Sequence, residues 1–315
     1  MRRSDERGIA LLLTLLVLTL LVAMILEFDA EARREYRDAA AFRDNFKATV
    51  LARASVQAAR GVLQQDFLKD KQAGQSFDAP TDLWAFPITN YPIGDGLLNA
   101  KIEDERSKLN LNDLATGGSP ADKAQKVQRF KRLFSLVQIN PDLVDAIVDW
   151  VDKDDQPEPS GAEILYYQSL RPSYRAANDQ LKTFLELRLI KGMTPEILAK
   201  LSKLVTVYDS AGDSMVNMNT ADAFVIQALH EDITQAIAAD IIQARPFKNS
   251  KVDDLDRVSS FTAIGMKIRN LYDIKSDLFL ARMAVRMNEM TRNAVVVLQR
   301  DQNTGTSTVK YYRVL

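Results

Sequence analysis

The sequence contains no cysteine, which excludes disulfide bonds, thiolate metal sites and cysteine nucleophiles together. Its one histidine, His230, stands beside Glu231 and Asp232, a setting more typical of a surface residue than of a catalytic base. No phosphate-binding loop, nucleophile elbow or zinc signature occurs. Neither sign of charge is in excess, because 41 Lys and Arg face 42 Asp and Glu, so bulk charge does not indicate a nucleic-acid partner. A hydrolase that uses a pair of carboxylates stays open, because Asp and Glu are abundant.

Charge is also missing from residues 9–26, where Thr14 and Thr19 are the only polar side chains. As a helix rising about 1.5 Å per residue, this run spans roughly 27 Å, close to the thickness of a hydrocarbon core. Three arginines precede it, between Met1 and Gly8, and positive charge favours the cytoplasmic side of a membrane. We therefore expect one membrane crossing, with the rest of the chain outside the cytoplasm.

An alternative for this segment is a cleaved signal peptide, with Ala30-Glu31-Ala32 as the small-residue cleavage site. Acidic residues crowd that site, and residues 31–60 contain neither glycine nor proline and are rich in helix formers. We therefore favour one helix of about 60 residues, with its first third in the membrane and the remainder packed on a domain. The apolar stripe that we expect on this helix comprises Phe42, Phe46, Val50, Ala54, Ala58 and Val62.

Beyond this helix, the hydrophobic periodicity of the sequence changes twice, from that of a strand to that of helices and back. Alternating residues predict a strand over 97–105, and helical periodicity then prevails over about 119–266. Alternation returns near the C-terminus, where the sequence DQNTGT separates two strands of a predicted hairpin. A helical block between two β segments predicts an α+β fold in which the helices are inserted into the sheet.

A short acidic loop, DWVDKDDQPEPSGAE, follows one of the predicted helices. Carboxylates placed this close repel one another, so a bound cation would favour their folding together, and oxygen ligands without His or Cys favour Ca²⁺ over Zn²⁺. The spacing of Asp152, Asp154 and Glu163 matches three ligand positions of an EF-hand loop, but Pro157 replaces the glycine which that loop needs. A solvated acidic loop is the alternative, and composition alone does not decide between the two.

The N-terminal pattern resembles that of type IV pilins and type II secretion pseudopilins. In those proteins a prepilin peptidase cuts after the glycine of the leader, here Gly8, and methylates the new N-terminus, here Ile9. Most members carry glutamate at the fifth mature position, where this chain has Leu13. The K-type minor pseudopilins (general secretion pathway protein K) lack that glutamate, and the stretches KLNLNDL, VDAIVDWVDKDDQPEPSGAEILYY, ELRLIKGMTPEI and VNMNTADA strengthen the resemblance to them.

Leucine at this position has a physical consequence. A glutamate buried in a bundle of helices needs the N-terminus of a neighbour as its partner. Because Leu13 leaves no carboxylate to be paired, a subunit of this kind is suited to the end of a filament. We expect Leu13→Glu to impair assembly at the tip or extraction from the membrane.

The resemblance implies a fold, partners and a cofactor. The implied function is that of a structural, non-enzymatic subunit at the tip of the secretion pseudopilus, with I-type and J-type minor pseudopilins as partners and the inner membrane as its location before assembly. It also implies a calcium ion in a structural role, for which we select Asp149, Asp152, Asp154, Asp155 and Glu163. The expected organisation is a leader (1–8), a transmembrane segment (9–28), a pilin-like α+β part (29–118), an inserted helical domain (119–275) and C-terminal strands (276–315) of a small antiparallel sheet.

The stretch MVNMNTADAFVIQALHEDITQAIAADIIQAR is similar to half of a competence-type DNA-binding helix-hairpin-helix. Such a hairpin presents glycine backbone N–H groups to phosphate. Here the hairpin reads LHEDIT, without glycine and with Glu231 and Asp232 in its place. We expect no nucleic-acid binding, and a membrane-anchored DNA-binding protein remains the alternative function.

Overall fold

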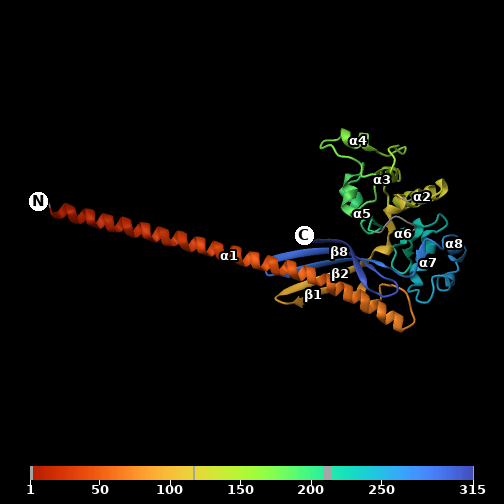
Figure 1. The fold of residues 1–315 in the computed structure, drawn as a ribbon, viewed down its shortest axis with the longest axis horizontal. Coiled ribbons are helices and arrows are strands. Elements are labelled where there is room, and N and C mark those ends of the chain that lie inside the picture. The colour runs from red at the N-terminus through yellow and green to blue at the C-terminus, as the bar shows by residue number, and fades with distance from the viewer. Residues whose placement is uncertain (1–2, 116–117, 209–213, 315) are drawn as a thin grey trace.

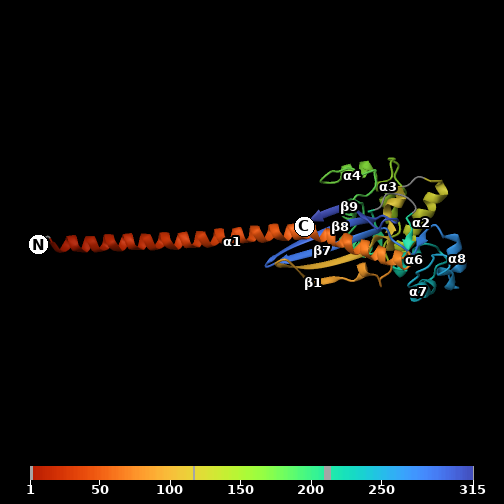
Figure 2. The same cartoon turned by 60° about the horizontal axis from the view of Figure 1, so that its bottom comes forward.

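One long helix dominates the molecule (Figure 1). The computed structural model describes residues 3–115, 118–208 and 214–314. Helix α1 (Arg3–Gln72) has 70 residues, somewhat more than expected, and its N-terminal part projects away from the rest (Figures 1 and 2). An 18-residue window of this part has a mean hydropathy of 3.1 and none of it is buried within the protein. By length and composition, α1 includes one segment able to cross a membrane.

The other end of α1 packs on a five-stranded antiparallel sheet in the order β1-β2-β7-β8-β9. The strand expected over 97–105 is β2, and the hairpin predicted around DQNTGT is β8 and β9. β2 and β7 are neighbours in space although most of the helices lie between them in sequence. The strands are β1 (Ile88–Ile93), β2 (Gly96–Asp104), β7 (Leu278–Met287), β8 (Met290–Arg300) and β9 (Ser307–Val314).

The helical domain is an insertion between β2 and β7, with a hydrophobic core separate from that of the sheet and α1. It begins directly after Asp104, earlier than the boundary expected at 119, because residues 109–110 pair with a strand inside the insertion and leave the large sheet. Its elements are β3 (Leu109–Asn110), α2 (Pro120–Leu136), α3 (Leu143–Val151), α4 (Ile164–Ser169), α5 (Pro195–Leu201), β4 (Val205–Thr206), β5 (Val216–Asn217), α6 (Ala223–Ala228), α7 (Gln235–Gln243), α8 (Thr262–Lys267) and β6 (Tyr272–Asp273).

The insertion consists of two halves that use the same asparagine motif. Each half has one two-stranded parallel ladder, β3 with β4 and β5 with β6. In each, the first Asn of an Asn-X-Asn sequence accepts a hydrogen bond from the backbone N–H of the second, Asn110 from Asn112 and Asn217 from Asn219. The second Asn then bonds to the backbone of two later segments of its own half. The stretches KLNLNDL and VNMNTADA therefore form the same structural motif, once in each half of the insertion.

The packing face of α1 differs from the stripe that the sequence suggested. The stripe at every fourth residue is largely solvent-exposed, with Phe42 74%, Phe46 63% and Val50 48% exposed. A spacing of four overshoots the helical repeat by about 40° each time, so such a series winds around the helix and leaves any one face. The residues that meet the sheet follow a mixed spacing of three and four and are mostly small: Ala48, Ala52, Val56, Ala59 and Leu63.

Candidate functional site

The acidic loop lies between α3 and α4, and Asp149 of α3 organises it. Asp149 is fully buried, and its two carboxylate oxygens accept from the backbone N–H of Glu158 at 3.0 and 3.3 Å. Gly161 runs against the same carboxylate so closely that a Cβ at this position would lie 1.9 Å from Asp149 Oδ2. Asp149 therefore shapes the backbone of the loop, and its oxygens are already used for that purpose.

Three of the five acidic residues selected from the sequence converge. Asp152, Asp154 and Glu163 each offer a carboxylate oxygen, and these atoms lie within 4.8 Å of one another. Glu163 is only 6% exposed, yet neither of its oxygens has a hydrogen-bond partner, and the same holds for Asp152 Oδ1. Burial raises the pKa of Glu163 to about 7, and the charges of Asp149 and Asp152 act in the same direction. Buried, unsatisfied carboxylate oxygens that converge fit a hard cation such as Ca²⁺.

The fifth acidic residue, Asp155, has a different partner that the sequence did not indicate. Its Oδ1 accepts from Asn178 Nδ2 at 3.1 Å, and Asn178 Nδ2 also donates to the carbonyl of Asp154 at 3.0 Å. Asn178 Oδ1 is buried without a partner. Asn178 therefore ties the exposed side of the acidic loop to the following segment.

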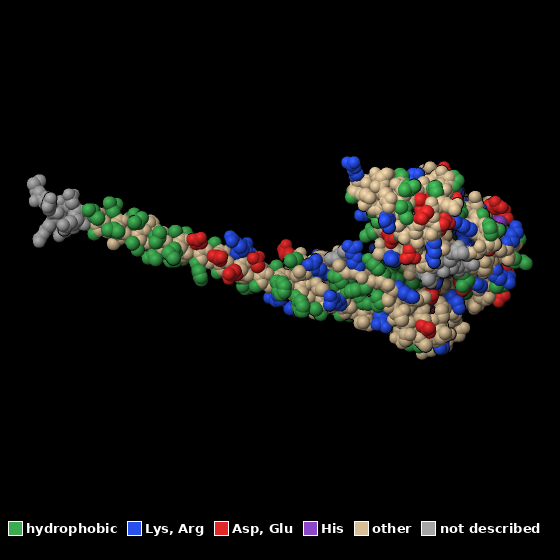
Figure 3. Space-filling model, turned by 45° about the horizontal axis from the view of Figure 1, so that its top comes forward, with side chains coloured by type: hydrophobic (Ala, Val, Ile, Leu, Met, Phe, Trp, Pro, Cys, Tyr) green, Lys and Arg blue, Asp and Glu red, His purple; other side chains and the backbone are tan. Residues whose placement is uncertain are grey.

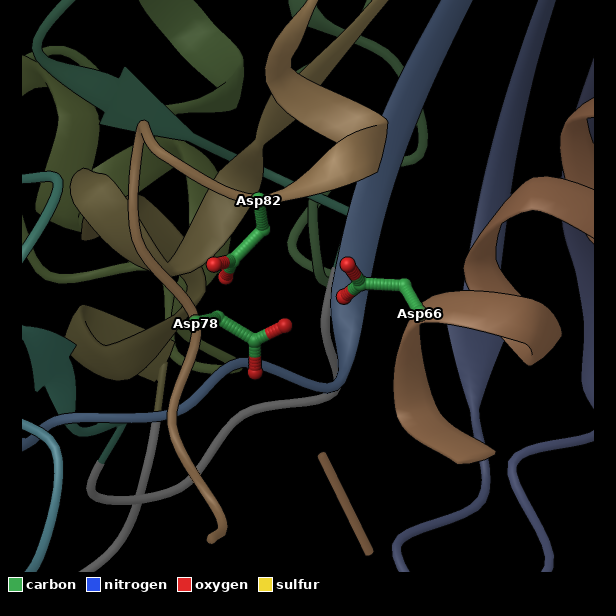
Figure 4. Close-up of side chains that lie close together, drawn as sticks. All are labelled: Asp66, Asp78 and Asp82. Carbon is green, nitrogen blue, oxygen red and sulfur yellow. The ribbon is translucent and has the colours of Figure 1, made fainter. Parts of the chain in front are cut away.

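A second cluster of carboxylates lies where α1 meets the sheet and the insertion (Figure 4). Asp66 of α1, Asp78 and Asp82 are all less than a tenth exposed and point toward one another, with oxygens within 4.8 Å. Nη2 of Arg300, the last residue of β8, donates to both oxygens of Asp78 at 2.7 Å, and Nη1 lies 3.8 Å from Asp66 Oδ2. A guanidinium therefore already supplies positive charge here, and the cluster joins α1 to the segment before β1 and to the end of β8.

The membrane-anchor residues lie in regular helix. Gly8, Ile9 and Leu13 all belong to α1, and the helix runs through them without interruption. Ile9 is 59% and Leu13 is 55% exposed, as are most apolar side chains of the projecting part. Figure 3 shows this apolar part followed by a charged section before α1 reaches the domain. These three residues are therefore accessible along the free end of the helix.

The hairpin between α6 and α7 uses its polar groups internally. His230 Nδ1 accepts from the backbone N–H of Asp232 at 3.1 Å, and Asp232 pairs with Lys267 at 3.1 Å. Glu231 and Asp232 add two carboxylates to this hairpin. That the hairpin does not bind DNA stays a prediction from its acidic sequence.

Comparison with known proteins gives a consistent result. Two family descriptions, both of type II secretion system protein K, match residues 107–210 and 216–275, which correspond to the two halves of the insertion. A type II secretion system protein K from Klebsiella pneumoniae is 31% identical over 256 residues, which cover 76% of this chain and 75% of that protein. The chain belongs to the type II secretion system protein K family. It is a minor pseudopilin, a structural component of type II secretion.

Two further likenesses extend over nearly the whole protein K chain. A type II secretion system protein K from Pseudomonas aeruginosa is 29% identical over 312 residues, covering 96% of this chain and 91% of that one. A solved structure described as the GspK-GspI-GspJ complex from enterotoxigenic Escherichia coli contains a chain that superimposes with a TM-score of 0.72 at 21% identity. The match covers 87% of this chain and 98% of that chain, so the two proteins share their fold over most of this chain.

Proposed function

We propose that this protein K occupies the tip of the type II secretion pseudopilus, in a complex with I-type and J-type minor pseudopilins, and has no catalytic role. The observation that carries the proposal is the position of the helical insertion, which lies at the end of the molecule opposite the free part of α1 (Figures 1 and 2). A subunit stacked above would meet this bulk. Leu13 agrees with such a place, because it leaves no carboxylate that needs a neighbour's N-terminus.

The partners would bind along the exposed face of α1. Phe42, Phe46 and Val50 form an apolar surface that the chain's own sheet leaves uncovered, beyond the charged section that follows the apolar anchor. Apolar side chains of this size in a contiguous row mark a protein interface more often than a solvated surface. The solved relative was determined in a complex whose description includes I and J proteins, which agrees with this assignment.

Copurification of the full chain with coexpressed I-type and J-type proteins tests the assignment. We expect Phe42→Glu with Phe46→Glu to abolish copurification, because two carboxylates would be buried in the interface. The control is Leu165→Glu in α4, which changes an apolar side chain that is 82% exposed and far from this face. Copurification of the double variant at the parental level would contradict the proposal.

We also propose that α1 is anchored in the inner membrane with the bulk of the chain in the periplasm, and that prepilin peptidase cuts after Gly8. The mature protein would then begin with methylated Ile9, which intact-mass measurement detects. A mature chain starting at Arg33 would instead mean a cleaved signal peptide and a soluble protein. Leu13→Glu should reduce secretion, and normal secretion by this variant would remove the support that Leu13 gives to the tip assignment.

For the acidic loop we propose a structural Ca²⁺ ion held by Asp152, Asp154 and Glu163. The buried oxygens of Glu163 and Asp152 without partners support it, because a desolvated carboxylate needs a compensating charge. When bound, Ca²⁺ would neutralise these side chains; Asp149 and Asn178 hold the loop backbone around them.

A thermal melt of the full chain in detergent, first with EDTA and then with excess Ca²⁺, tests the ion. We expect a higher melting temperature with Ca²⁺, and no response in Glu163→Gln. Equal melting temperatures of the parent in EDTA and Ca²⁺ would reduce this loop to a solvated acidic surface. A response that persists in Asp154→Ala combined with Glu163→Gln would place the ion elsewhere.

A further inference from the structure

One lysine reaches the converging carboxylates from a different helix. Lys123 lies in the first turn of α2, and its Nζ is 3.3 Å from Asp152 Oδ2 and 4.0 Å from Glu158 Oε1. Its backbone is fixed by the N-terminal cap of α2, where Ser119 and Asp122 bond reciprocally and the N–H of Lys123 donates to the carbonyl of Ser119. The cap therefore directs a cationic side chain across to the acidic loop.

The other lysines of this region contact different groups. Lys131, two turns further along α2, pairs with Asp145 Oδ1 at 2.7 Å. Lys191 donates to the carbonyls of Gly161 at 2.8 Å and Ser160 at 3.3 Å, and so holds the backbone of the loop. Of these three lysines, Lys123 is the one in ion-pair contact with a converging carboxylate, that of Asp152.

We propose that Lys123 is an internal counter-ion of the calcium site, which neutralises Asp152 when no metal is bound and withdraws when Ca²⁺ binds. The proposal rests on the calcium site proposed above. An ammonium on a flexible four-carbon stem can serve this purpose, because it makes point-charge contacts and leaves them without rearranging the backbone. The side chain of Lys123 is 40% exposed, so water can take up the ammonium when it leaves Asp152.

This arrangement makes the ion and the lysine competitors for Asp152. Calcium binding then includes the loss of the Lys123 contact, which lowers the affinity by the strength of that contact. Because the pair is partly exposed, we expect the contact to be modest, corresponding to a two- to fivefold change in the dissociation constant. When calcium is absent, Lys123 neutralises the carboxylate of Asp152 and links the loop to α2.

Calcium titration of the full chain in detergent by isothermal calorimetry tests the proposal, with thermal melts in parallel. We expect Lys123→Met to bind Ca²⁺ two- to fivefold more tightly than the parent. The variant should melt at a lower temperature than the parent in EDTA, and the two should converge in saturating Ca²⁺. The control is Lys101→Met, which removes the same charge from an ion pair with Glu103 on β2, and it should leave the calcium affinity unchanged.

Unchanged or weaker binding by Lys123→Met would overturn the role of Lys123 while leaving the calcium site intact. Equal tightening by Lys101→Met would overturn it as well, because the effect would then follow from net charge alone. If the parent itself binds no Ca²⁺, the calcium site is wrong and the role of Lys123 falls with it. The parental titration therefore separates failure of the site from failure of the counter-ion.

Discussion

The two carboxylate clusters of this protein K obtain their positive charge in different ways. In the cluster of Asp66, Asp78 and Asp82, the guanidinium of Arg300, which is 5% exposed, contacts Asp78 and Asp66. In the acidic loop, the lysine that contacts a converging carboxylate, Lys123, is partly exposed, and both oxygens of Glu163 remain without partners. A buried internal cation makes a permanent joint, whereas an exposed and removable one leaves room for an ion from solution.

The largest expected effect is the loss of the internal cation. Arg300→Met should destabilise the protein by about 3–5 kcal/mol, because Asp78 and its neighbours are then buried without a compensating positive charge. Chemical denaturation of the full chain in detergent measures this difference. Arg282→Met is the control, since Arg282 is 53% exposed and pairs only loosely with Glu103, at 3.5 Å. An Arg300 variant as stable as the parent would mean that the joint needs no counter-ion.

Calcium should then distinguish the two clusters. A hundredfold excess of Ca²⁺ over its dissociation constant should stabilise the parent by about 2.7 kcal/mol by mass action. Asp66→Asn should retain this response in thermal melts, whereas Asp152→Asn should lose it. If Asp66→Asn lost the response and Asp152→Asn kept it, the ion would bind at the cluster near the C-terminal end of α1 and not in the acidic loop.

A smaller effect should come from the backbone that carries the acidic loop. Gly161→Ala places a methyl group against Asp149 and should cost about 1–3 kcal/mol, because either the carboxylate or the loop must move. It should also weaken calcium binding, as calorimetry can measure. Gly61→Ala is the matched control: nothing lies within 4 Å of its added Cβ, and alanine should stabilise helix α1. Wild-type behaviour of Gly161→Ala would show that Asp149 does not shape the loop.

The smallest expected effect is a pH dependence of the joint. Burial raises the pKa of Asp82 above its usual value of 3.8. A carboxyl with a raised pKa in the folded state contributes stability that is complete below pH 3.8 and is lost as the pH rises through the folded pKa. Stability should therefore decline as pH rises from about 4, by no more than about 1.4 kcal/mol per unit for this one group. Melts of Asp82→Asn across this range should lack that contribution, and an identical slope in both proteins would contradict it.

Local patterns in the sequence were sufficient to predict much of the fold. The long helix, strand β2, the hairpin of β8 and β9 and the helical insertion each follow from periodicity or turn residues in one stretch. The prediction of the packing face of α1 was wrong. The large side chains at every fourth residue give a stronger hydrophobic signal than the small residues that pack against the sheet. Small residues allow close packing but give a weak hydrophobic signal.

The candidate sites were less predictable for a different reason. Acidic residues in one short loop can be recognised by composition, but which of them converge depends on Glu158 and Asn178, whose backbone and amide groups occupy Asp149 and Asp155. The joint at the base of α1 had no local signal at all. Asp78 and Arg300 are separated by 222 positions, and only the folded sheet brings them together.

The position at which the insertion leaves the sheet determines how easily a domain can be gained or lost there. Asp104, the last residue of β2, lies directly opposite Phe279 at the start of β7. The entire helical domain is therefore joined to the sheet at the place where an ordinary hairpin would have its turn. Lengthening a connection costs little closure entropy, and a domain with its own core adds the remainder of its stability by itself. The turn between these two strands is therefore a place where a whole domain can be added while the strand pairing on either side of it is kept.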